Sequence, residues 1–156
     1  MQQVKLMYSL AASAIEIECN MAQAYTYASN LEYFSEWFPG VIAIASGNDI
    51  PHGNPGKIYH EIVQVPLRGR RRVRITVVQA ESPHLQITEG NLPALLPRME
   101  MRFTSLGAHR CTVEWRMYSR RSNGMSRFFI LPLARRIMRR RAPHGLAALK
   151  ALLEGG

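Results

Sequence analysis

Polar and apolar residues alternate along several segments of the chain. In residues 13–19, Ile15, Ile17 and Cys19 have one parity, and Glu16 and Glu18 have the other. Side chains two positions apart lie on the same face of a β-strand, so this segment is predicted to be a strand with one buried face. Alternation, or a high density of β-branched residues, predicts six further strands, at 41–45, 57–67, 70–79, 85–88, 98–105 and 110–119.

Two short helices are predicted between the first two strands. Asn20 is a suitable N-cap, and residues 21–29 repeat apolar side chains at helical spacing. A second short helical turn fits residues 31–37, and Pro39-Gly40 ends it. The chain is therefore expected to enter its second strand from a helical connection.

The last segment, residues 126–154, is predicted to be a long helix. An apolar stripe that includes Phe129, Leu133 and Ile137 runs along one side, and arginines occupy the opposite side. Pro132 and Pro143 lie inside this helix. Proline removes a backbone donor and clashes with the preceding turn, so bends or breaks are expected at both positions.

The predicted strands have one apolar and one charged face. The strongest hairpin signal joins 57–67 to 70–79 through Arg68-Gly69. The order of elements predicts an α+β fold, in which a curved seven-stranded antiparallel sheet is covered on its apolar face by the long helix. With 156 residues, the chain is expected to form a single domain over 1–156.

Several segments resemble one protein superfamily. Residues 30–41 read Asn-Leu-Glu-Tyr-Phe-Ser-Glu-Trp-Phe-Pro-Gly-Val, residues 81–85 read Glu-Ser-Pro-His-Leu, and residues 131–133 and 146–154 are similar to its closing helix. With the element order, they resemble the SRPBCC superfamily, the helix-grip group of START domains, birch-pollen-allergen-like proteins and polyketide cyclase/dehydrase-like proteins. The resemblance covers residues 12–154. One departure lies in the last hairpin, where residues 107–110 read Gly-Ala-His-Arg and members often carry Gly-Thr.

The resemblance implies a deep cavity between sheet and long helix that holds a lipid, a polyketide, a hormone or another apolar small molecule. We expect a hydrophobic or amphipathic ligand and no cofactor, with a polyketide cyclase, aromatase or dehydratase as the alternative. The residues expected to line the pocket are Trp37, Phe38, His60, Val73, Ile75, Val77, Met99, Met101, Phe103, Trp115, Met117, Phe129, Leu133 and Ile137.

An enzyme in such a cavity would need a positioned acid or base. Several other glutamates alternate away from the apolar face. The weak candidates that remain are Tyr59, His60 and Glu61. His60 and Glu61 are neighbours on a strand and therefore point to opposite faces. Only one of them can face the cavity, and the mixed pattern of residues 59–64 leaves the choice open.

The chain is strongly basic, with a formal net charge of +9, which favours an anionic partner. The arginines of the last helix have three interpretations. A solvated helix face is the one we favour; attachment to an anionic membrane, beside the apolar run 128–131, is the second. Nucleic-acid binding is the third, and the lack of a recognisable motif argues against it. The arginines concerned are Arg135, Arg136, Arg139, Arg140 and Arg141.

Cys19 and Cys111 are the only cysteines. Each has the apolar parity of its strand, so two buried free thiols are expected, which suits a reducing compartment such as the cytoplasm. A disulfide between them is the alternative. The scattered histidines and the lack of a Cys-x-x-Cys motif argue against a metal site. Whether the protein is a monomer or a homodimer is left open.

Overall fold

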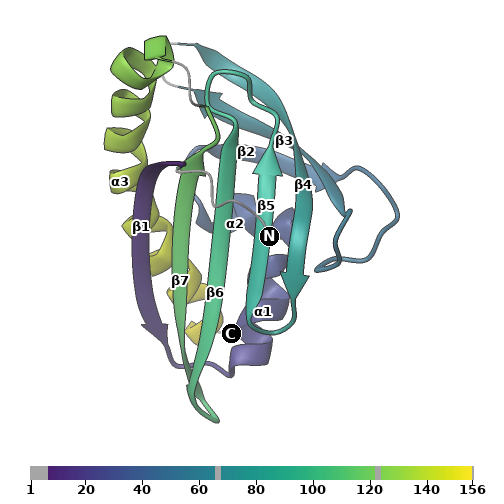
Figure 1. Ribbon diagram of the computed structural model, residues 1–156. Coiled ribbons are helices and arrows are strands. Elements are labelled where there is room, and N and C mark those ends of the chain that lie inside the picture. Colours follow the sequence, from purple (N-terminus) through teal and green to yellow (C-terminus); the bar gives the residue numbers. More distant parts are fainter. Residues whose placement is uncertain (1–6, 66–67, 122–123, 156) are drawn as a thin grey trace, which may run out of the picture.

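The computed structural model describes residues 7–65, 68–121 and 124–155. Within these ranges, strands and helices follow one another in the order expected from the sequence (Figure 1). The strands are β1 (Tyr8–Ile17), β2 (Val41–Ser46), β3 (Ile58–Val65), β4 (Gly69–Glu81), β5 (Leu85–Gly90), β6 (Pro97–Gly107) and β7 (Arg110–Ser119). The helices are α1 (Met21–Ser29), the single 3-10 turn η1 (Leu31–Tyr33), α2 (Phe34–Trp37) and α3 (Gly124–Gly155).

The seven strands form one antiparallel sheet in the order β1-β7-β6-β5-β4-β3-β2. The first strand therefore pairs with the last, and the helical connection carries the chain to the opposite edge. Together with the long C-terminal helix, this topology confirms the predicted α+β helix-grip fold.

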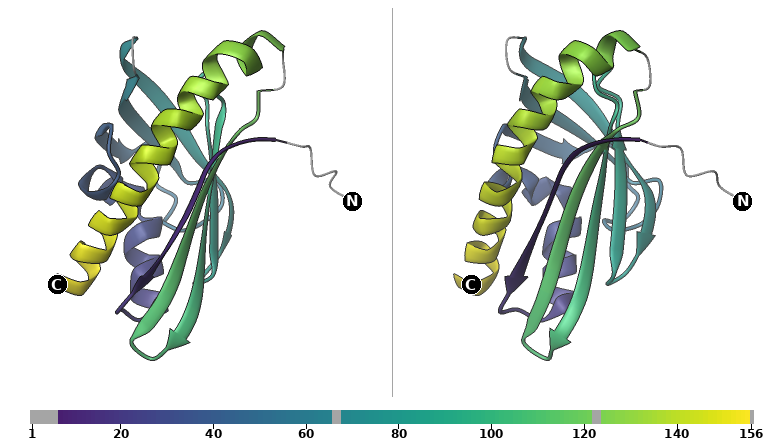
Figure 2. Two further views of the ribbon diagram at one scale, coloured as in Figure 1. Left: turned by 90° about the vertical axis from the view of Figure 1, so that its left-hand side faces the viewer. Right: turned by 60° about the vertical axis from the view of Figure 1, so that its left-hand side comes forward.

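The helix α3 crosses the concave face of the sheet (Figure 2). At the lower end of the molecule, α1 lies between the strands and the C-terminal part of α3. Its Tyr25 packs edge-on against Phe103 of β6, with ring centroids 5.2 Å apart. The lower half of the grip is therefore filled by α1, and the upper half is bridged by α3 alone.

The C-terminal half of α3 is held against the turn that follows α2. Ala142, Leu146 and Leu149 are buried at helical spacing. Gly145 allows the close approach, because a Cβ atom there would lie only 2.9 Å from the Phe38 ring. A larger side chain at this position would push the helix off the turn.

The breaks expected at Pro132 and Pro143 are absent, because α3 is continuous through both residues. Both prolines are exposed, and they lie about three turns apart on one side of the helix. The carbonyl groups that lose their partners are therefore on the water-facing side, where helices can curve and hydrate their backbone.

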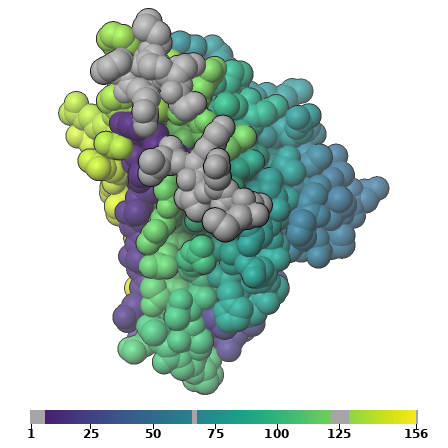
Figure 3. Space-filling model, viewed as in Figure 1, coloured from purple at the N-terminus to yellow at the C-terminus, as the bar shows by residue number. Residues whose placement is uncertain are grey.

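The outer face of the sheet carries charged side chains, and packed side chains cover the strands that are visible in the space-filling view (Figure 3). Arg98 there pairs with Glu89 at 2.9 Å and with Glu100 at 3.0 Å. Inside, Cys19 and Cys111 are buried free thiols, which confirms the prediction made for them, although Cys19 lies just beyond the end of β1. No described helix is both long and apolar enough to cross a membrane.

Candidate functional site

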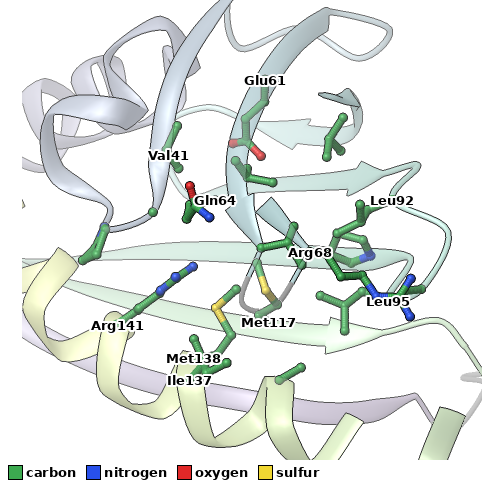
Figure 4. Close-up of a pocket in the computed structure, with 18 of the residues that line it drawn as sticks. Val41, Glu61, Gln64, Arg68, Leu92, Leu95, Met117, Ile137, Met138 and Arg141 are labelled. Atoms are coloured by element: carbon green, nitrogen blue, oxygen red, sulfur yellow. The ribbon is translucent and has the colours of Figure 1, made fainter. Parts of the chain in front are cut away.

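A cavity of about 320 Å³ lies in the upper half of the grip, between the sheet and the first half of α3 (Figure 4). Its volume is at the lower end of the range for small-molecule sites. The walls come from the α2–β2 turn, β3, the start of β4, the segment before β6, β7 and α3. The side chains and backbone that line it belong to Phe34, Phe38, Pro39, Gly40, Val41, Glu61, Val63, Gln64, Val65, Arg68, Val73, Leu92, Ala94, Leu95, Pro97, Met117, Phe129, Ile130, Leu133, Ala134, Ile137, Met138 and Arg141.

An aromatic cluster closes the lower end of the cavity. Phe38 stacks on Phe34 and on Trp115, with ring centroids 5.0 Å apart in each pair. Trp37 packs edge-on against Phe34. The four rings are buried, and they separate the hollow upper half of the grip from the half filled by α1.

A smaller recess of about 50 Å³ continues from the cavity toward the sheet. The two spaces share Phe34, Glu61, Val73, Pro97 and Met117. The recess is additionally lined by Ile75, Thr88, Gly90 and Met99. Glu61 therefore lines both the main cavity and the recess.

Glu61 is the buried carboxyl group of the cavity. It is only 6% exposed, and its Oε2 atom has no hydrogen-bond partner among the described residues. Burial raises the pKa of this carboxyl from 4.5 to about 7, because an apolar environment disfavours the charged form. The site therefore holds one carboxyl group that is ready to change its protonation state near neutral pH.

Arg141 lies on the opposite wall, on α3 (Figure 4). Burial lowers the pKa of its guanidinium. The group packs on Gly40, whose φ of +89° and missing side chain leave the space: a Cβ atom there would lie 2.4 Å from Nη1 of Arg141. Within the described part of the chain, no carboxylate lies within ion-pair distance of it.

Most predicted pocket residues are buried on the concave side, but only some line the cavity. Those that do are Phe38, Val73, Met117, Phe129, Leu133 and Ile137, while Ile75 and Met99 line the recess. Trp37, Val77, Met101, Phe103 and Trp115 line neither space. They also face the concave side, but they belong to the packed core and the aromatic cluster. The periodicity of a strand does not distinguish a core residue from a residue of a cavity wall.

His60 was expected to line the pocket, and this is wrong. It is exposed, whereas its neighbours Tyr59 and Glu61 are buried. Tyr59 lines neither the cavity nor the recess, and its hydroxyl group forms a hydrogen bond with His52 Nδ1 at 2.6 Å. His52 in turn contacts Glu32 at 3.0 Å. Of the three catalytic candidates, only Glu61 contributes to the cavity.

The arginines of α3 differ in their surroundings. Arg136, Arg139 and Arg140 are exposed. Arg135 is partly covered, with its guanidinium 4.1 Å from the Tyr8 ring centroid. The assignment of Arg141 to the outer basic surface is wrong, because this side chain is half-buried and lines the cavity.

Two parts of the wall were missed from the sequence. The irregular segment before β6 contributes Leu92 and Leu95, and its proline-rich composition suggested only a connection. The C-terminal end of β3 contributes Val63 and Gln64. A known register between β3 and β4 would have identified the inward-facing residues of β3, because residues paired across a sheet share a face. No group of three or more metal-ligating side chains occurs among the described residues.

The comparisons with known proteins agree with this architecture. The family model for "Polyketide cyclase / dehydrase and lipid transport" matches residues 10–154. A START superfamily protein from Mycobacterium smegmatis is 12% identical, with a TM-score of 0.74 over 94% of this chain and 98% of that one. The KanY protein is 18% identical, with a TM-score of 0.74 over 96% and 99% of the two chains.

A larger protein contains the same fold. The di-domain ARO/CYC protein StfQ, from the steffimycin biosynthetic pathway, is 14% identical, with a TM-score of 0.71 over 95% of this chain and 51% of that one. The chain thus corresponds in length to about half of that protein. At these identities the likeness shows the fold alone. The comparison with curated proteins finds no match.

Proposed function

Because the chain belongs to the polyketide cyclase/dehydrase and lipid transport family, of the SRPBCC type, we propose that it binds a hydrophobic or amphipathic small molecule, such as a lipid or a polyketide-like compound. The single observation that carries the proposal is the apolar cavity under α3. Apolar surface in contact with water is unfavourable, and a bound apolar molecule would remove the apolar walls of the cavity from water.

Binding can be tested by filling the cavity with protein. Ala134 lines the cavity from α3, and Ala147 is exposed on the same helix. We expect the wild-type protein to bind methyl laurate or lauric acid and to unfold at a higher temperature in their presence. Ala134→Phe should abolish both effects, and Ala147→Phe should abolish neither. Equal binding by Ala134→Phe, or no binding by the wild type, would overturn the proposal.

An enzymatic role is the second candidate, and Glu61 is the observation that favours it. A buried carboxyl group with a pKa of about 7 is suited to accept or donate a proton at neutral pH. In a cyclase or dehydratase it would take a proton from the carbon between two carbonyl groups of a polyketide-like substrate.

This candidate predicts proton exchange in a simple probe. With the N-acetylcysteamine thioester of acetoacetate in deuterated buffer, the wild type should accelerate exchange at the carbon between the carbonyls. Glu61→Gln should lose this acceleration, and Glu16→Gln, at an exposed position, should keep it. Acceleration that survives in Glu61→Gln would rule out this role for the carboxyl group.

A further inference from the structure

Of the side chains that the structure describes, four polar ones line the cavity, and two of them, Gln64 and Arg68, are exposed to solvent. The other two, Glu61 and Arg141, are shielded from it. Glu61 is nearly inaccessible to water, and its Oε2 atom has no partner among the described residues. A buried oxygen without a hydrogen bond is costly, and Glu61 lines a space large enough for a ligand. A ligand with a hydroxyl or another hydrogen-bond donor would supply the missing partner.

Arg141 is the second shielded polar side chain of the cavity. Its guanidinium carries five N–H donors, and in the part of the chain that is described none of them meets a carboxylate within ion-pair distance. The group is half-buried on the cavity wall, where a charge without a partner is unfavourable. A carboxylate is the natural partner, because it matches the guanidinium fork.

Glu61 and Arg141 do not pair with each other. Burial raises the pKa of Glu61, and no ion pair joins Glu61 to Arg141 among the described residues. Glu61 and Arg141 also project from opposite walls, β3 and α3 (Figure 4). The two groups therefore do not neutralise each other, and each is left to interact with a bound molecule.

We infer that the cavity selects a bipolar amphiphile: an apolar body with a hydrogen-bond donor that reaches Glu61 and an acidic group that pairs with Arg141. This inference rests on the proposed binding function and specifies the class of ligand. The aliphatic and methionine walls, with Val63, Met117 and Ile137 among them, enclose the apolar body.

Four laurate derivatives separate the two polar contacts. Methyl laurate has neither group, lauric acid has the acid, methyl ω-hydroxylaurate has the hydroxyl, and ω-hydroxylauric acid has both. Their affinities are measured by calorimetry for the wild type, Glu61→Met and Arg141→Met. Methionine keeps an unbranched side chain in both variants, and Arg140→Met is the control at an exposed position of the same helix.

The hydroxyl group should strengthen binding about tenfold in the wild type and in Arg141→Met, and should give no gain in Glu61→Met. The carboxylate should strengthen binding about tenfold in the wild type and in Glu61→Met, and should give no gain in Arg141→Met. Arg140→Met should behave as the wild type. If Arg141→Met does not fold, Arg141→Gln takes its place.

The inference is overturned if either group gives no gain in the wild type, or if its gain persists when its partner residue is replaced. In that case methyl laurate still binds, and the proposed binding function stands. If methyl laurate and the other three probes all fail to bind the wild type, the binding function itself is wrong, and the inference fails with it.

Discussion

Glu61 illustrates how one position in a strand acquires its chemistry from its surroundings. It is an ordinary glutamate in the sequence, next to an exposed histidine. The pairing of Glu61 with Val73 turns the carboxyl group toward the concave side, because residues opposite each other in a sheet share a face. The apolar cavity then raises its pKa to about 7.

This environment predicts a pH-dependent stability. Between pH 4.5 and 7, the unfolded chain releases the Glu61 proton while the folded protein retains it. The stabilisation from the neutral carboxyl is therefore complete below the unfolded pKa and is lost as the pH rises through the folded pKa. Glu61→Gln cannot titrate, so its free energy of unfolding relative to the wild type should rise by about 3 kcal/mol across this window.

Urea unfolding at a series of pH values measures this difference. Glu16→Gln is the control, because it removes a carboxyl group from an exposed position. A flat difference for Glu61→Gln would mean that the carboxyl is hydrated in the folded protein, contrary to its burial.

At the scale of elements, α3 serves two environments at once. Its buried side packs on the aromatic turn through Gly145 and lines the cavity through residues such as Ala134. Its outer side carries exposed arginines, and Phe129, on the cavity wall, is 71% exposed. Exposed aromatic and basic side chains on one helix are typical of segments that bind anionic membrane surfaces.

We therefore predict that α3 mediates binding to anionic vesicles. Replacing Arg136, Arg139 and Arg140 together by Gln should weaken sedimentation with phosphatidylserine-containing vesicles about 100-fold, since each basic residue contributes about 1 kcal/mol near such a surface. The matched control removes the same charge from the outer face of the sheet. It replaces Arg72, Arg74 and Arg102, which are also exposed.

Equal losses in the two triple variants would indicate a response to net charge and not a surface on α3. Binding of the wild type to neutral phosphatidylcholine vesicles with the same affinity would also contradict an electrostatic contact.

At the scale of the whole molecule, the interior of the grip is divided into a filled and a hollow half. The helix α1 fills the lower half (Figure 2), and Phe38 stacks between Phe34 and Trp115 at the boundary. The cavity is thus a local gap above a well-packed core, which lets the protein combine stability with an open binding space.

This division predicts different roles for two phenylalanines of the cavity wall. Phe38 is 5% exposed and Phe129 is 71% exposed. Phe38→Ala should lower the free energy of unfolding by about 3–5 kcal/mol, because it empties the aromatic boundary. Phe129→Ala should change it by no more than about 0.5 kcal/mol. Denaturant titration measures the free energy of unfolding of both variants. Similar losses in the two would mean that the aromatic cluster around Phe38 does not contribute more to stability than the exposed Phe129.

The order of elements and the apolar face of the sheet could be predicted from the sequence. Alternation in β6 and β7 assigned Met99, Met101, Trp115 and Met117 to the concave side, and all are buried there. Side-chain parity within a strand is a local property, so it follows from neighbouring residues alone. The length of α3 followed for the same reason, from the spacing of its apolar residues.

The site depended on relations between distant segments. A tight turn at Arg68-Gly69 would pair residue 67 with residue 70 and place Glu61 opposite Thr76, on the outer face. In the structure Val65 pairs with Gly69, and this change of register turns Glu61 inward.

The place of Arg141 likewise depended on the contact of α3 with Gly40, two segments about a hundred residues apart. A periodic pattern records which side of a helix is apolar, but it does not record how far that helix stands from the sheet. The sequence by itself therefore determined a curved sheet gripping a long helix. Only the tertiary structure decided where the grip is hollow and which polar groups face that space, because both depend on distances between separate elements.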